Sequence, residues 1–191
     1  MRILIVKLSS IGDVVHALPA ASFLRRAMPG AHISWVVERR ASAILKGCPV
    51  IDDLIEIDTR SWRKGWSNAS TFGQVRRFTK ALREDAGYDI AIDFQGLIKS
   101  GLVAYASRAR RRIGFEPAEL RESASRVLLT EHVITSSFNH VIEKNLALAR
   151  AAASRDGGGL PGDAADHLPY EFPIAVSPED EQFIEAATGP A

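Results

Sequence analysis

The chain has 191 residues, of which 46% are hydrophobic, and this proportion excludes an intrinsically disordered protein. Its formal net charge is only +1, so bulk charge gives no argument for nucleic-acid binding. The single cysteine, Cys48, excludes an internal disulfide, and without an evident signal peptide we expect a reducing cytoplasm. No apolar run approaches the ~20 residues that span a bilayer, so we expect any membrane contact to be peripheral.

Strand-like and helix-like segments alternate along the first part of the chain. In chain order, the pattern predicts a strand at 2–7, a helix at 13–28, a strand at 32–38, a short helix at 40–46, a strand at 53–57, a helix at 71–86, a strand at 88–93, a helix at 101–107, strands at 112–115 and 131–135, and a helix at 138–153. This alternation predicts an α/β fold with a Rossmann-like, doubly wound, mostly parallel sheet that helices cover on both faces.

The composition changes after residue 154. Residues 154–163 are rich in Gly and Pro, which is typical of a linker, and Ser177 with Pro178 then provides a good helix start. We therefore expect a domain at 1–154, a linker at 155–176 and the start of a second domain at 177–191. On this interpretation the chain is the N-terminal half of a longer protein.

The segment around Asp13 is the most informative part of the sequence. A buried strand, a short turn that contains Ser10 and Gly12, and a helix follow one another, so the Asp13 carboxylate lies at a strand-to-helix junction. Ligands of open α/β sheets bind at such junctions, and a carboxylate at a helix N-terminus stays ionised, which suits a general base. An N-cap is the other interpretation, because Asp is a favoured capping residue.

Residues 93–100 form a second polar junction, directly after the strand predicted at 88–93. We expect them to line the same crevice as Asp13, since both junctions lie at the carboxyl edge of the sheet. Gly96 lets the backbone approach a ligand closely, and Lys99 and Ser100 fall at a helix start, where an anion is easily held. Ordinary turn chemistry with a solvated Lys99 is the alternative.

Two basic clusters follow other strands. Residues 60–66 hold three cations and two tryptophans, a composition that favours phosphates, carboxylates and sugar rings. A surface loop with its indoles packed on the domain and RNA binding are the alternatives. Residues 108–112 indicate a solvated edge or contact with an anionic membrane surface. Arg121 is placed to reach the crevice, whereas His140 is expected to cap the last long helix or to lie on the surface. The sequence has no phosphate-binding glycine loop and no zinc-ligand spacing.

Four of these motifs occur in the order found in a known family. Residues 1–20, the strand Trp35-Val36-Val37-Glu38, the cluster at 60–66 and the junction at 93–100 together resemble the bacterial lipopolysaccharide heptosyltransferases, glycosyltransferase family nine. The resemblance covers about residues 1–150. It implies a GT-B enzyme with two Rossmann-like halves, of which this chain holds the half that binds the acceptor.

The resemblance also implies a reaction and a site. The reaction is an inverting transfer of heptose from ADP-L-glycero-D-manno-heptose to Kdo-lipid A, with no metal and no cofactor, in lipopolysaccharide inner-core synthesis. Asp13 is the expected base. The residues expected to bind the acceptor are Ser10, Gly12, Arg60, Arg63, Lys64, Gln95, Lys99 and Arg121. We expect the chain alone to be inactive, and to act in the cytoplasm on the anionic inner face of the inner membrane.

Other functions stay open on the sequence alone. The chain could be a non-catalytic module that binds the acceptor, a second or third heptosyltransferase, or an unrelated nucleotide-binding domain. The basic-aromatic cluster at 60–66 favours transfer to Kdo-lipid A.

Overall fold

The structure, a computed structural model, describes the chain except for residues 60, 62–68, 85–86, 155–168, 177 and 190–191. Its centre is a six-stranded, all-parallel sheet in the order β3-β2-β1-β4-β5-β6. The strands are β1 (Arg2–Val6), β2 (His32–Glu38), β3 (Asp53–Ile57), β4 (Ile90–Asp93), β5 (Arg111–Phe115) and β6 (Glu131–Val133). This arrangement confirms the predicted Rossmann-like α/β fold.

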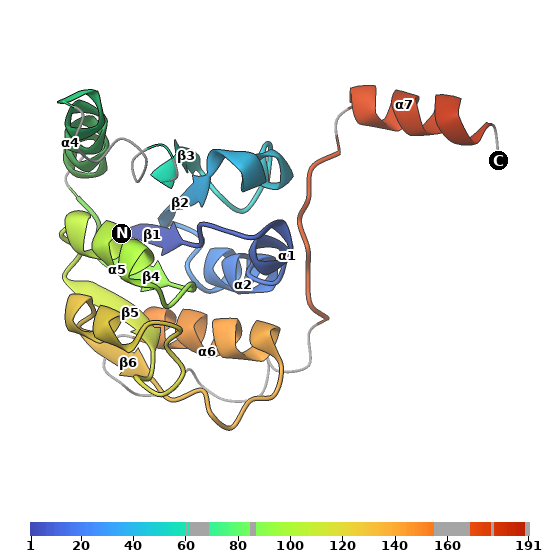
Figure 1. Ribbon diagram of the computed structural model, residues 1–191. Helices are drawn as coiled ribbons and strands as arrows, with labels where there is room; N and C mark the ends of the chain where they lie inside the picture. Colours follow the sequence, from blue (N-terminus) through green and yellow to red (C-terminus); the bar gives the residue numbers. More distant parts are fainter. Residues whose placement is uncertain (60, 62–68, 85–86, 155–168, 177, 190–191) are drawn as a thin grey trace.

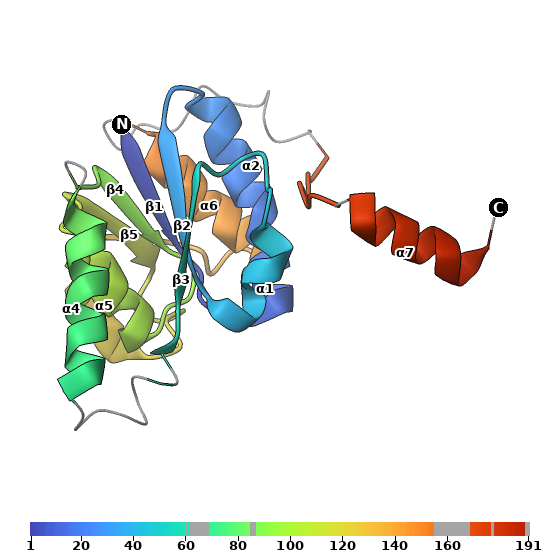
Figure 2. The ribbon, with the colours of Figure 1, turned by 90° about the horizontal axis from the view of Figure 1, so that it is seen from above.

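Helices cover both faces of the sheet (Figures 1 and 2). One face carries α2 (Leu18–Ala27) and α6 (Val141–Ala153), and the other carries α4 (Ala69–Glu84) and α5 (Ile98–Ala106). Residues of β1 alternate between the two cores: Ile3 and Ile5 pack toward α2 and α6, whereas Leu4 and Val6 pack toward α4 and α5. A strand that is buried on both faces has to be apolar throughout, which explains its continuous apolar sequence.

The single helix predicted at 13–28 is wrong, because the structure has two. A short helix, α1 (Ile11–Val15), ends before α2 begins, with Pro19 in the first turn of α2. Proline lacks an N–H group and clashes with the carbonyl four residues before it, so it is tolerated in a first turn but not in a helix interior. Asp13 therefore lies on a separate short helix. The short helix predicted at 40–46 is a 3₁₀ segment, η1 (Arg39–Leu45).

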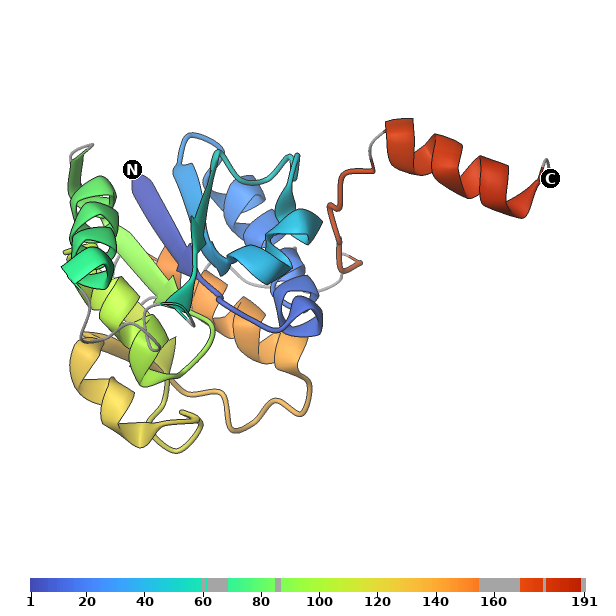
Figure 3. The same cartoon turned by 45° about the horizontal axis from the view of Figure 1, so that its top comes forward.

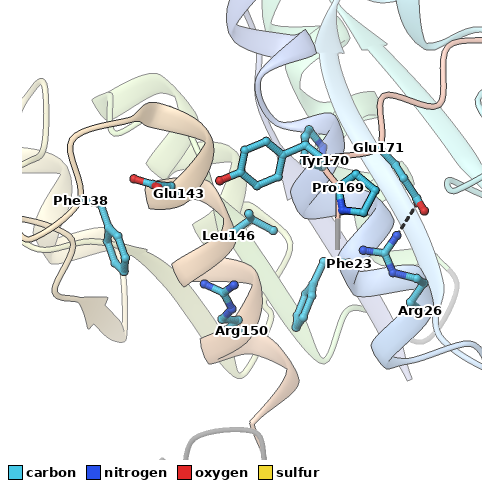
Figure 4. Close-up of a pocket in the computed structure, with 10 residues that line it drawn as sticks. Phe23, Arg26, Phe138, Glu143, Leu146, Arg150, Pro169, Tyr170 and Glu171 are labelled. Atoms are coloured by element: carbon cyan, nitrogen blue, oxygen red, sulfur yellow. Dashed lines mark hydrogen bonds and ion pairs between the residues drawn. The ribbon is translucent and has the colours of Figure 1, made fainter. Parts of the chain in front are cut away.

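The C-terminal residues that the structure describes form an extended stretch at 169–176 and a helix, α7 (Pro178–Thr188). The stretch returns to the sheet domain, where Glu171 forms an ion pair with Arg26 of α2. Figure 4 shows Tyr170 and Glu171 beside α2 and α6, at a groove of about 320 Å³ that Phe23 and Leu146 also line. In Figure 1, α7 lies apart from the sheet domain. None of the described helices combines the length and apolar character needed to cross a bilayer.

Candidate functional site

The candidate site lies where the strand order reverses, between β1 and β4. The two strands are paired, with Val6 beside Asp93 at their carboxyl ends. The loops that leave these strands therefore start side by side at one edge of the sheet. In an open α/β sheet this switch point is where ligands bind, so both predicted polar junctions fall in the expected place.

Gln95 connects the two loops. Its side-chain carbonyl oxygen, Oε1, accepts hydrogen bonds from the backbone N–H groups of Leu8 at 3.1 Å and Ser9 at 3.3 Å. Gln95 is only 4% exposed, so these bonds lie in the interior. The amide fixes the path of the chain just before Ser10. Gln95 therefore holds the first loop in place in addition to lining the site.

Asp13 stands at the third position of α1, and Ser10 is the N-cap. Its Oδ2 accepts a hydrogen bond from the backbone N–H of Ser10 at 2.9 Å, with the Ser10 Oγ at 3.4 Å. Burial acts to raise the pKa of Asp13, but the Ser10 N–H and the charges of Lys7 and Arg121 outweigh it, so the pKa lies below its ordinary value. Asp13 is therefore ionised at neutral pH and, with a side chain 23% exposed, open to a ligand. Asp13 is not itself the N-cap, but it is the N3 residue of a capping box with Ser10, so the capping interpretation holds in this modified form.

Lys7 is a site residue that the sequence analysis missed. It is only 2% exposed, and its Nζ donates a 2.7 Å hydrogen bond to the carbonyl oxygen of Phe94. Burial lowers the pKa of Lys7 to about 8, although the charge of Asp13 opposes the shift. A buried cation thus lies close enough to Asp13 for its charge to lower the pKa of that carboxyl. The signal available in the sequence was a lysine directly after an apolar strand, two residues before the Ser-Ser turn.

A third loop, after β5, completes the site. Nη2 of Arg121 lies 3.7 Å from Oδ1 of Asp13, and the Arg121 side chain is 58% exposed. The next residue, Glu122, joins this loop to the loop after β4: its N–H donates to the carbonyl of Gly96 at 3.1 Å, and its Oε2 accepts from the N–H of Ile98 at 2.6 Å. Arg121 therefore reaches the crevice, as expected.

Gly96 has a structural reason to be glycine. Its φ is +69°, in the region that favours glycine, and a Cβ there would lie 3.5 Å from the backbone nitrogen of Arg121. A Cβ would meet its neighbours at 3.4 Å or more, an ordinary contact distance, so the positive φ rather than the space requires glycine here. The close approach of the backbone to a ligand stays a prediction.

Lys99 and Ser100 lie in the first turn of α5, as expected, but they have different partners. Nζ of Lys99 is 3.8 Å from Oε1 of Glu38, a buried carboxylate at the end of β2 that also accepts a hydrogen bond from Thr59 Oγ1. Ser100 is fully buried and donates from Oγ to Oδ2 of Asp93 at 2.9 Å. Lys99 is thus held at the rim of the site. Ser100 lies in the interior, where its bond to Asp93 stabilises the loop after β4.

A pocket of about 210 Å³ opens beside these loops. Lys7, Gln95 and Arg121 line it, together with Lys144, which pairs with Glu119. Its lining holds three cations and one carboxylate, Glu119, so its net charge is positive, which suits an anionic ligand. The pocket is also small, and it lies next to the Asp13–Arg121 pair. In the described part of the chain, no three His, Cys, Asp or Glu side chains gather where they could hold a metal ion.

The predicted site residues come together only in part. Ser10, Asp13 and Arg121 are in contact, Gln95 lies beneath them, and Gly12 is exposed on α1. Lys99 points to Glu38 instead. Arg60, Arg63 and Lys64, with the two tryptophans of their cluster, lie outside the described residues.

Two further expectations concern other positions. The basic run at 108–112 is not a simple solvated edge: Arg111 binds Glu131 and three carbonyl groups at the end of α6, and Arg112 donates to the carbonyl of Leu128. His140 is the N-cap of α6, where its Nδ1 accepts a hydrogen bond from the N–H of Ile142 at 3.2 Å, as expected.

Comparison with known proteins agrees with this fold. The model of glycosyltransferase family 9 (heptosyltransferase) matches residues 75–173. Lipopolysaccharide heptosyltransferase 1 of Escherichia coli strain K12 is 32% identical over 98% of the chain and 59% of its own length, and that of Pseudomonas aeruginosa is 44% identical over 52% of the chain and 28% of its own length. The solved structure of E. coli heptosyltransferase WaaC with ADP-2-deoxy-2-fluoro heptose superposes with a TM-score of 0.72 at 32% identity, over 79% of this chain and 48% of that one.

The fold and the switch-point crevice define one half of a GT-B glycosyltransferase. The chain belongs to glycosyltransferase family 9, the heptosyltransferases of lipopolysaccharide synthesis. It spans 59% of the length of its E. coli K12 relative.

Proposed function

We propose that this chain supplies the acceptor half of an inverting heptosyltransferase, and that Asp13 is its general base. The substrates would be ADP-L-glycero-D-manno-heptose and Kdo-lipid A. The observation that carries the proposal is an ionised, partly exposed carboxylate held at the switch point of the sheet. The membership in family 9 supplies the reaction class.

The geometry suits a proton transfer from a sugar hydroxyl. Such a hydroxyl is a very weak acid, so the proton has to leave while its oxygen attacks the anomeric carbon of the donor and ADP departs. Asp13 Oδ2 is engaged by Ser10, whereas Oδ1 faces Arg121 at 3.7 Å, longer than a hydrogen bond. A hydroxyl that approaches Oδ1 therefore meets a carboxylate already oriented on one side.

The cations around the crevice favour an anionic acceptor. Lys7 and Arg121 line the pocket beside Asp13, and Lys99 stands at its rim. We propose that Arg60, Arg63 and Lys64 from the basic-aromatic cluster also bind the acceptor's acidic groups. Ser10, Gly12 and Gln95 would contact the acceptor along the crevice. Both the carboxylate of Kdo and the phosphates of lipid A would be bound by such groups.

The second half of the reaction needs a domain that binds the donor. We propose that residues 1–154 form the acceptor domain, 155–176 a linker and 177–191 the beginning of the donor domain. On this assignment the 191-residue chain transfers no heptose by itself, and it works at the anionic inner face of the inner membrane, where its lipid-linked acceptor lies.

The test is a transfer assay on a protein in which this chain is joined to the donor domain of the P. aeruginosa or E. coli relative. Asp13→Ala and Asp13→Asn should each lower kcat by about 10²–10⁴, the usual contribution of a general base. Asp53→Asn, at an exposed carboxylate on the opposite edge of the sheet, is the matched control and should keep its rate. If the Asp13 variants retain near-normal kcat while remaining folded, Asp13 is not the base.

A further inference from the structure

The solvent side of α5 carries an apolar stripe. Ile98, Leu102 and Tyr105 recur at four- and three-residue spacing and are 41%, 51% and 56% exposed. The opposite side of the same helix is also apolar and is buried: Val103 and Ala104 belong to the core. A surface helix normally has one apolar side, which packs on its own domain. The second apolar side of α5 is therefore available to something outside the domain.

The elements beside this stripe are strongly basic. On α4 the exposed side chains include Arg76, Arg77, Lys80 and Arg83. Arg83 also joins the two helices, because its Nε donates to the carbonyl of Ala106 at 2.9 Å. Residues 69–83 and 98–112 include no Asp or Glu, although the chain as a whole has a net charge of only +1. Positive charge is thus concentrated on α4, because Lys99 of α5 pairs with Glu38 and Arg111 pairs with Glu131.

The 3₁₀ segment η2 (Ser123–Leu128) extends the same surface. It packs on α5 at Gly101, where a Cβ would lie 2.9 Å from Cδ1 of Leu128. Val127 is 75% exposed, and its neighbour Arg126 is exposed as well. Figure 3 shows α4 and α5 on one side of the sheet, with η2 at the lower end of that side. We call the solvent side of α4, α5 and η2 the α4/α5 face.

We propose that the α4/α5 face docks on an anionic lipid bilayer. Apolar side chains that enter the headgroup region, flanked by arginines that bind lipid phosphates, are the combination that peripheral membrane proteins use. Tyr105 has the amphipathic ring that favours this boundary, and the guanidinium of Arg112 lies 5.5 Å from its ring centroid. The absence of carboxylates from 69–83 and 98–112 provides the charge complementarity.

The place of the face relative to the candidate site strengthens the proposal, which in this respect rests on the proposed function. The stripe begins at Ile98, the first residue of α5, and its N–H is bound by the Glu122 carboxylate of the third loop. Lys99, at the rim of the site, is the next residue. An acceptor anchored in the bilayer under the α4/α5 face would therefore need to extend only its sugar head over the rim to reach Asp13.

The experiment is flotation of the 191-residue chain with vesicles that contain no glycolipid. One set consists of phosphatidylcholine, and the other is an equal mixture of phosphatidylglycerol and phosphatidylcholine. We expect binding to the anionic vesicles only. Arg76→Gln with Arg126→Gln should weaken the partition by about 25-fold, since each cation near such a surface contributes about fivefold. Arg40→Gln with Lys46→Gln, two exposed cations of the η1 region, is the matched control and should change it little.

A second pair of variants tests the apolar stripe. Leu102→Gln should weaken binding by about tenfold. Phe183→Gln, at an exposed residue of α7, should leave it unchanged. Circular dichroism confirms that each variant is folded.

Several results would overturn the proposal. These are no binding to anionic vesicles, equal loss in the η1 control, loss in Phe183→Gln but not in Leu102→Gln, or a stripe that instead drives self-association or RNA binding. Because the vesicles hold no acceptor, a chain that docks but, once joined to a donor domain, transfers no heptose would refute the proposed function and leave the docking surface standing.

Discussion

Replacing the buried Asp93 with asparagine should stabilise the protein at neutral and higher pH. Asp93 is fully buried at the end of β4, and burial raises its pKa to about 6, although hydrogen bonds from Gln95, Ser100 and Gly96 oppose the shift. The ordinary value is 3.8. A difference of about two pKa units means that ionised Asp93 lowers the free energy of unfolding by about 3 kcal/mol.

The direction of the pH effect follows from proton binding. Between about pH 4 and pH 6 the folded state holds the Asp93 proton more tightly than the unfolded state, so the free energy of unfolding falls as pH rises through this window. Asparagine keeps Oδ1 as the acceptor for the N–H groups of Gln95 and Gly96. Its Nδ2 can donate to Ser100 Oγ, whose own proton can go to the carbonyl of Leu97 at 2.8 Å. No buried group therefore loses its partner.

Urea unfolding at pH 5 and pH 8 measures both effects. At pH 8 we expect Asp93→Asn to unfold with a free energy about 2–3 kcal/mol above that of the parent chain, and at pH 5 the gap should be smaller. Asp53→Asn, at an exposed carboxylate, is the control. A variant that is less stable than the parent at pH 8, or that keeps the parent's slope between pH 4 and 6, would refute the reasoning.

Two further predictions concern cations. Lys7→Met removes a charge that lowers the pKa of Asp13, so the acidic limb of the pH profile of kcat/KM should move to higher pH once the chain is joined to a donor domain; an unmoved limb would contradict the proposed coupling. Arg111→Gln should lower the free energy of unfolding by about 2–4 kcal/mol, because the carbonyls at the end of α6 and the Glu131 carboxylate lose their donor. Urea unfolding measures this loss, and the exposed Arg108→Gln should change stability by less than about 0.5 kcal/mol.

The fold could be predicted from the sequence because its strands are short apolar segments between polar residues. The strand predicted at 32–38 matches β2, and that at 53–57 matches β3. The helix predicted at 13–28 failed at one point, where apolar spacing continued through Pro19 while the backbone could not. The spacing of apolar residues indicates which face of a helix is buried, but it does not indicate where one helix ends and the next begins.

The candidate site was predictable where it follows a strand directly. Asp13 and the junction at 93–100 lie at the carboxyl edge, because parallel strands deliver their following loops there. The burial of Lys7, the contact of Glu38 with Lys99 and the raised pKa of Asp93 were not predictable. Each depends on which strands are neighbours and in what register, and this information is not local in the sequence.

The hydrogen bonds of Gln95 and Glu122 have a consequence for affinity. Together they tie the loops after β1, β4 and β5 to one another before any ligand arrives. The entropy lost in ordering these loops is therefore lost during folding, and a saccharide that enters the crevice does not have to restrain them again. Ligand binding should consequently change the mobility of these three loops very little.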